Sequence, residues 1–182
     1  MSTVSLEQLK YPIGPYHKPE HFSDEDLASW IHSIENLPGQ LIELTADLDS
    51  EQLAWIYRPE GWSIKQVVHH LADSHINCWA RFKLALTEEH PTIRPYDEVS
   101  WAKLPDGNDD DLSDSLTLLT GLHARLTKTL RNIQGDQWNR TLVHPANQEV
   151  FDIAQLLAMY AWHSDHHAAH IEQALAHENH FS

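Results

Sequence analysis

The stretch from Asp152 to His177 reads DIAQLLAMYAWHSDHHAAHIEQALAH, and its pattern decides the fold. It contains no proline or glycine, and Asp152 with Gln155 three residues later matches the capping box that begins many helices. One set of side chains recurs at steps of three or four residues, the period of a single helix face: Leu156, Tyr160, His163, His167, Ile171 and Ala174. The stretch therefore predicts a long helix whose stripe packs against other helices.

Three further segments show the same helical period, at about residues 23–48, 63–89 and 112–133. Neither repeats nor a Gly/Ser-rich linker divide the chain. The sequence predicts an all-α protein, a four-helix bundle that forms one domain over residues 1–182.

The connections between these helices differ in length. More than twenty residues join the second and third helices, which predicts a long connection that crosses the bundle as irregular chain. Its helix-breaking residues are Pro91, Pro95, Pro105 and Gly107. Residues 141–144 and 149–151 indicate a short β-like excursion before the last helix.

Charge and cysteine content narrow the class of protein. Twelve Lys and Arg against 27 Asp and Glu give a formal net charge of -15, which disfavours nucleic acid as a partner. The lone Cys78 cannot form an internal disulfide. We find neither a signal peptide pattern nor a run long enough to span a membrane, so we expect a cytoplasmic protein. The expected partner is a small-molecule substrate.

Histidine is the unusual component, with fifteen residues. At this abundance about one His-x-x-x-His pair arises by chance, so spacing alone is weak evidence for a metal site. His163 and His167 gain support because they continue the apolar stripe and can converge on one ion from a single helix face. His166 and His170 share this spacing on a neighbouring face, where a second layer and a subunit contact are both open interpretations.

A catalytic zinc-type site takes three protein ligands, so one more must come from another helix. The second helix offers His69, His70 and His75. Its apolar stripe places His75 near the centre and His70 at the edge, and spacing alone does not decide between these two. A hydrogen-bonded core histidine is the alternative for either.

Several blocks of sequence resemble the DinB/YfiT-like family of metal-dependent hydrolases, and specifically its YfiT branch. These blocks are YPIG (11–14), WSIKQVVHHLADSH (62–75), RFKLALTE (81–88), IRPYDE (93–98) and YAWHSDHHAAHI (160–171). Because they agree in order over most of the chain, the resemblance is more specific than any single histidine pair.

The resemblance implies a four-helix bundle, a homodimer, and a divalent metal held by His70, His163 and His167. Zinc and nickel are the expected ions, since imidazole suits both. The family's activities imply two reactions: hydrolysis, or transfer to an electrophile of a low-molecular-weight thiol such as bacillithiol. Both follow from a metal that activates water or a thiol. A non-catalytic metal-binding bundle with a role in stress response is a further interpretation.

The sequence assigns no catalytic acid or base. Gln66 and Asn77 lie near the expected site, where surface or packing roles are favoured over an orienting one. Cys78 is expected in the core. The acidic run 109–111 is expected as a solvated loop, because it lacks calcium-loop spacing. Six tryptophans are expected to supply core bulk or line a pocket: Trp55, Trp62, Trp79, Trp101, Trp138 and Trp162.

Overall fold

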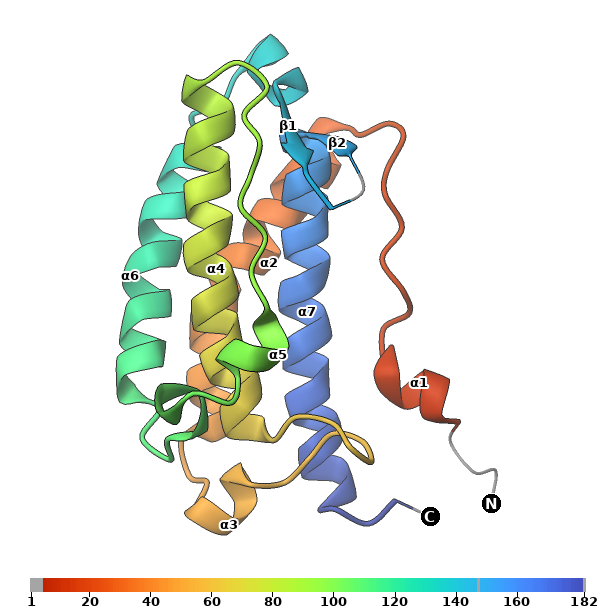
Figure 1. The fold of residues 1–182 in the computed structure, drawn as a ribbon, viewed down its shortest axis with the longest axis vertical. Helices are drawn as coiled ribbons and strands as arrows, with labels where there is room; N and C mark the ends of the chain where they lie inside the picture. Colours follow the sequence, from red (N-terminus) through yellow and green to blue (C-terminus); the bar gives the residue numbers. More distant parts are fainter. Residues whose placement is uncertain (1–4, 147, 182) are drawn as a thin grey trace.

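The structure, a computed structural model, describes residues 5–146 and 148–181. Four long helices form a bundle and confirm the predicted all-α class (Figure 1). They are α2 (Asp24–Thr45), α4 (Ile64–Thr87), α6 (Ser113–Leu130) and α7 (Ile153–His177). Among the described helices, none is both long and apolar enough to cross a membrane.

All four predicted helix starts agree with the structure to one residue, and side chains cap three of them, the starts of α2, α4 and α7. Ser23, Ser63 and Asp152 each accept a hydrogen bond from a backbone N–H of the first turn, and each forms a reciprocal capping box. The first three helices end two or three residues earlier than predicted, at Thr45, Thr87 and Leu130.

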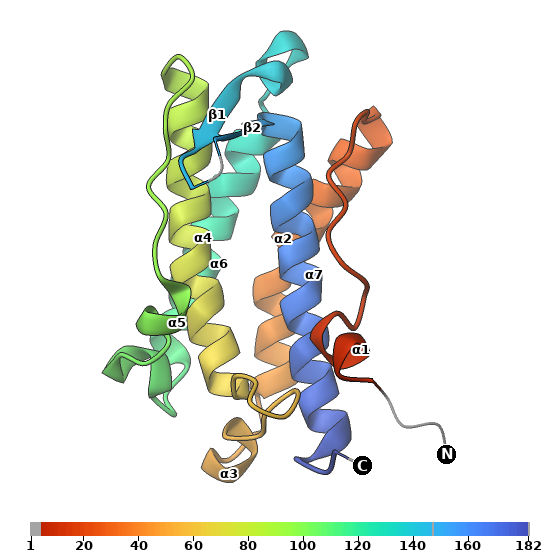
Figure 2. The same cartoon turned by 45° about the vertical axis from the view of Figure 1, so that its right-hand side comes forward.

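The order of the helices around the bundle is unusual. Helix α2 packs beside α7 and α6, and α4 packs beside the same two helices, so α2 and α4 are diagonal. Figures 1 and 2 show α2 and α7 running in one direction while α4 and α6 run in the other. Because α4 and α6 are parallel neighbours, the chain between them must return along the full length of the bundle.

This returning connection confirms the predicted crossover, and it descends beside α4 in both views. It differs from the prediction in being partly ordered into helix, with α5 (Glu98–Trp101) and the 3-10 helix η1 (Pro105–Asn108). Asp97 caps α5 by accepting a hydrogen bond from the Ser100 backbone. A short polar cap of this kind forms one turn without the long apolar period that the sequence analysis required.

A small hairpin at one end confirms the predicted β-like excursion. Strands β1 (Thr141–His144) and β2 (Glu149–Asp152) pair antiparallel after the 3-10 helix η2 (Gly135–Asn139), while Asn147 lies outside the described residues. The crossover is tied to β1, because the Ile93 N–H donates to Val143 O at 3.0 Å. The hairpin thus fixes the upper part of the crossover beside α4.

Two further short helices, α1 (Leu6–Lys10) and α3 (Ser50–Leu53), were also not predicted. Helix α3 lies between α2 and α4, and α1 lies beside the lower part of α7. From α1 the chain climbs along the outside of α7 to the start of α2 (Figure 2). We call residues 6–19 the N-terminal strap.

The core consists of two apolar clusters, separated along the bundle by histidine. The cluster nearer the hairpin includes Ile34, Phe82 and Leu126, and the other includes Leu37, Leu71 and Ile171. On α4, α6 and α7 the residues between these clusters are His75, His123, His163 and His167. A polar layer in the middle of a bundle is costly unless it is hydrogen bonded or serves a ligand.

Candidate metal centre

Three histidines converge at the edge of this layer. His70 comes from α4, and His163 and His167 come from consecutive turns of α7. One ring nitrogen of each lies within 4.8 Å of the others, and the Nε2 atoms of His70 and His163 are 3.2 Å apart. The structure therefore brings together the three residues named from the sequence.

The spacing fits a common ion. Two imidazole nitrogens bound to zinc at 2.0–2.1 Å with a tetrahedral angle are separated by about 3.4 Å. The 3.2 Å between the Nε2 atoms of His70 and His163 is close to that value, and in the absence of an ion it is the length of a hydrogen bond between the two rings. Each of these nitrogens carries either a proton or a lone pair, and two lone pairs facing each other are stabilised by a cation.

Burial keeps the three imidazoles neutral. Desolvation lowers the pKa of His70 to about 4. It is also the main cause that lowers the pKa values of His163 and His167 well below the ordinary value, and neighbouring imidazoles lower them further. Neutral imidazole is the form that binds a metal, so the site is ready to do so at neutral pH.

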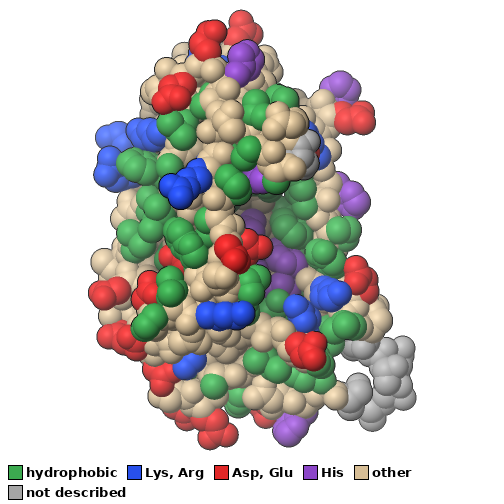
Figure 3. Space-filling model, viewed as in Figure 1, with side chains coloured by type: hydrophobic (Ala, Val, Ile, Leu, Met, Phe, Trp, Pro, Cys, Tyr) green, Lys and Arg blue, Asp and Glu red, His purple; other side chains and the backbone are tan. Residues whose placement is uncertain are grey.

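The cluster opens into a cavity of about 370 Å³. Figure 3 shows histidine at the bottom of a recess between hydrophobic and charged side chains. The Trp62 ring lies 4.6 Å from His70. The other lining residues are Ser74, Arg81, Tyr96, Glu98, Met159, Tyr160 and Trp162. A group held by the histidines can therefore meet a small molecule.

A chain of hydrogen bonds sets the tautomer of His167. His170 Nε2 lies 3.1 Å from the Lys10 carbonyl oxygen, which only accepts, so this nitrogen carries the proton. The Nδ1 of neutral His170 then accepts from His167 Nδ1, 3.4 Å away. His167 Nε2 is left with its lone pair, as metal binding requires.

Comparison with known proteins agrees with this geometry. The family model described as the DinB superfamily matches residues 33–171. The chain belongs to the DinB superfamily. It is 46% identical to "Putative metal-dependent hydrolase YfiT" of Bacillus subtilis, over 91% of this chain and 93% of that protein.

Other DinB relatives with the same kind of designation come from Bacillus licheniformis and Halalkalibacterium halodurans. They are 44% and 43% identical, over 92% and 91% of this chain and 95% and 96% of their own lengths. The solved structure of Bacillus subtilis YfiT, described as having an unusual four-helix bundle topology, superimposes with a TM-score of 0.91. The superposition covers 94% of this chain and 98% of the YfiT chain, and the two sequences are 44% identical.

Within this DinB bundle, His75 is part of a closed pair and not of the cluster. His75 is fully buried, and its Nδ1 lies 2.9 Å from His123 Nε2 with the rings stacked. His123 Nδ1 in turn donates to the Ile34 carbonyl oxygen. The centre of the apolar stripe on α4 therefore holds a core histidine, and the edge position holds the residue that reaches the pocket.

Sequence reasoning missed His123. It lies on α6 four residues after Leu119 and three before Leu126, both fully buried. That register was visible in the sequence and could have placed an imidazole in the core opposite His75.

The second pair on α7, His166 and His170, lies under the N-terminal strap. His166 stacks on Trp162 with ring centroids 4.4 Å apart, and the Trp162 indole donates to Gly14 O at 3.0 Å. His170 stacks on Tyr57 at 3.7 Å. The pair is thus a second layer behind the cluster.

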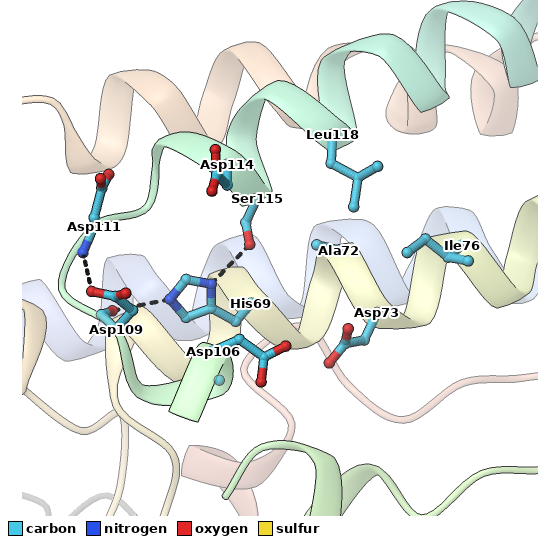
Figure 4. Close-up of a pocket in the computed structure, with 11 residues that line it drawn as sticks. His69, Ala72, Asp73, Ile76, Asp106, Asp109, Asp111, Asp114, Ser115 and Leu118 are labelled. Atoms are coloured by element: carbon cyan, nitrogen blue, oxygen red, sulfur yellow. Dashed lines mark hydrogen bonds between the residues drawn. The ribbon is translucent and has the colours of Figure 1, made fainter. Parts of the chain in front are cut away.

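His69 faces away from the cluster, into a separate cavity of about 300 Å³ between α4 and α6 (Figure 4). Its ring bonds to Ser115 Oγ at 2.8 Å and to the Asp109 carbonyl oxygen at 3.0 Å. Both nitrogens therefore have partners in the protein. Asp109 belongs to the acidic run 109–111, which lies in a loop as predicted.

The remaining candidates have structural roles. Gln66 completes the cap of α4 and donates to Ala102 O, and Asn77 donates to Asp73 O. Cys78 is fully buried, and burial raises the pKa of its thiol well above the ordinary value, so it stays protonated. Of the six tryptophans considered from the sequence, Trp62 and Trp162 line the histidine pocket.

Proposed function

We propose that the chain is a metal-dependent hydrolase of the DinB type, with a divalent ion held by His70, His163 and His167. The observation that carries this is the convergence of three neutral imidazoles at the wall of a cavity. When bound by three neutral ligands, zinc or nickel supplies Lewis-acid activation of water or of a thiol.

The protein's own residues would prepare this chemistry in three ways. His170 holds His167 in the tautomer that presents Nε2 to the cluster. The indole rings of Trp62 and Trp162 line the pocket and would give it apolar walls. The hydroxyl of Tyr160, which accepts a hydrogen bond from Arg81 Nη1 at 2.7 Å, keeps its own proton available for a substrate oxygen.

Metal content of untagged protein tests the site. We expect one ion per chain in the wild type and a loss of affinity of about two to three orders of magnitude in His70→Ala and His163→Ala, because each removes one of few ligands. The matched control is His69→Ala, one residue away on α4 but facing the other cavity. Wild-type stoichiometry in both ligand variants would contradict the assignment.

Product analysis tests the reaction. Metal-loaded protein would be incubated with small esters, amides and electrophilic halides, with and without bacillithiol, and products identified by mass spectrometry. We expect cleavage products that disappear when the metal is stripped. Conjugates that form only with the thiol would instead identify a thiol S-transferase, and no turnover with either would indicate a metal-binding bundle without catalysis.

A further inference from the structure

Arg81 lies where two cavities meet. It lines the histidine pocket and also a neighbouring cavity of about 240 Å³ under the hairpin, and Met159 is the other residue the two share. The second cavity is mainly apolar, with Ile93 and Phe151 among its walls. A ligand that reaches from the histidine cluster toward the hairpin must therefore pass the guanidinium of Arg81.

The guanidinium of Arg81 forms no ion pair with a carboxylate among the described residues. Glu98 lines the first cavity but is exposed to solvent, and Glu149 lines the second and pairs with Lys18 at 3.3 Å. A partly buried cation without a counter-ion favours an anionic ligand.

The hydrogen-bond donors of Arg81 point to the shape of that anion. Nη1 is used, because it donates to the Tyr160 hydroxyl. Nε is buried without a partner, and no hydrogen bond of Nη2 is found among the described residues. Nε and Nη2 form one edge of the guanidinium, and two parallel N–H groups on one edge match the two oxygens of a carboxylate.

Tyr160 adds a third donor beside this edge. Its oxygen accepts from Arg81, so its own O–H remains free to donate. The Tyr160 ring centroid is 6.1 Å from that of His163, so the donors lie next to the cluster but outside it.

We propose that Arg81 and Tyr160 form a subsite that binds a carboxylate of the substrate, a few bonds from the atom attacked at the histidine cluster. This deepens the proposed function and rests on it for the reaction, but not for the binding. It names the substrate class as small carboxylic acids with an apolar part that fits under the hairpin.

Binding of benzoate against its neutral isostere benzamide tests the subsite, measured by calorimetry on both metal-loaded and metal-depleted protein. We expect wild type to prefer benzoate in both forms. Arg81→Gln should lose about 10- to 100-fold in benzoate affinity, the scale of charge-assisted hydrogen bonds, with benzamide unchanged. Arg125→Gln is the matched control, because that guanidinium lies 5.0 Å over the Trp79 ring and lines neither cavity.

Two further variants keep the test decisive. If Arg81→Gln does not fold, Arg81→Lys retains the charge but not the paired donors, and we expect it to weaken benzoate by about tenfold. Tyr160→Phe removes one neutral donor and should cost about three- to tenfold.

Several results would overturn the subsite. These are equal binding of benzoate and benzamide, unchanged benzoate affinity in the Arg81 variants, or benzoate binding that requires the metal and ignores Arg81. Tighter binding of phenylphosphonate than of benzoate would overturn the assignment to carboxylates. If the protein binds no metal, the proposed function fails alone, because the metal-depleted arm still measures the subsite.

Discussion

Two groups of histidines occupy the same layer of the bundle, but their ring nitrogens face different partners. The closed pair, His75 and His123, passes its hydrogen bonds inward to a backbone carbonyl at Ile34. The open cluster of His70, His163 and His167 turns its nitrogens toward one another at the wall of a cavity. The residue type is the same in both groups and most members of each are buried, so residue type alone does not distinguish structure from function here.

The difference lies in where the lone pairs go. In the closed pair a carbonyl accepts the last proton, so each nitrogen between the rings has a defined role as donor or acceptor. In the cluster, His70 and His163 face each other without such an acceptor. Buried imidazoles are therefore core residues where their chain of hydrogen bonds ends on a backbone carbonyl, even though His75 Nε2 has no partner among the described residues. They are ligand candidates where they face only one another at the wall of a cavity.

Lowering the pH should protonate the buried imidazoles of both groups, and the resulting loss of stability is the largest effect we expect. The pKa of His123 is lowered by burial to about 4, below the ordinary 6.5, so between these values the unfolded chain binds a proton that the native protein does not. Stability should then fall as pH drops from 6.5 to 4, by about 3 kcal/mol for this imidazole alone.

Urea unfolding of metal-depleted protein across that range measures this slope. The other imidazoles of the layer shift in the same direction and add to it. His123→Gln should reduce the slope by about one proton. A free energy of unfolding independent of pH between 6.5 and 4 would contradict the buried, neutral state of the layer.

Substitution by leucine should separate the groups. His75→Leu removes the donor to His123 Nε2 and leaves it buried without a partner, at a cost of about 1–3 kcal/mol. His70→Leu removes the hydrogen-bond partner of His163 Nε2, but His163 lines the cavity, where water can replace the lost bond, so metal-depleted protein should lose under about 1 kcal/mol. Denaturation and metal analysis together check this: we expect His75→Leu to keep the metal and His70→Leu to lose it. The reverse result would exchange the roles of the two groups.

Substitutions in the layer behind the cluster should change the metal affinity of the cluster less than loss of a ligand does. His170→Phe keeps a ring stacked on Tyr57 but removes the acceptor of His167 Nδ1, so metal affinity should fall about 10- to 100-fold. Competition with a chromogenic chelator measures this. His166→Phe is the matched control, because it leaves the His167–His170–Lys10 chain intact. Equal affinities in the two variants would show that the tautomer is not fixed through His170.

Much of this architecture was predictable from the chain. The starts of α2, α4 and α7 follow from Ser23, Ser63 and Asp152, because capping is a local interaction between residues three apart. The crossover follows from length, since more than twenty residues are not needed to join antiparallel neighbours.

The choice between His70 and His75 was not predictable from periodicity. The stripe identifies the side of α4 that faces the core, and His75 lies at its centre. A ligand pocket, however, opens at the edge of a buried face, where His70 meets α7. Deciding this requires the neighbouring helix, and only the resemblance to a family supplied that information.

The packing of the N-terminal strap against α7 was not predictable from the sequence either. Its contacts with α7 are mostly backbone carbonyls that accept from side chains, as Gly14 O does from Trp162 and Lys10 O from His170. Every residue carries a carbonyl, so no pattern of side chains marks which ones will be used.

His69 provides the smallest expected effect and the sharpest control on the comparison. It is as buried as His70 and adjacent to it, but Ser115 and the Asp109 carbonyl complete its hydrogen bonds. His69→Gln retains one donor and one acceptor, so the free energy of unfolding should fall by about 1 kcal/mol or less, with metal stoichiometry unchanged. Metal analysis beside urea unfolding checks both statements. A loss of metal comparable to that of His70→Ala would mean that hydrogen-bond completion does not distinguish core histidines from ligands, and the contrast between the closed pair and the open cluster would lose its basis.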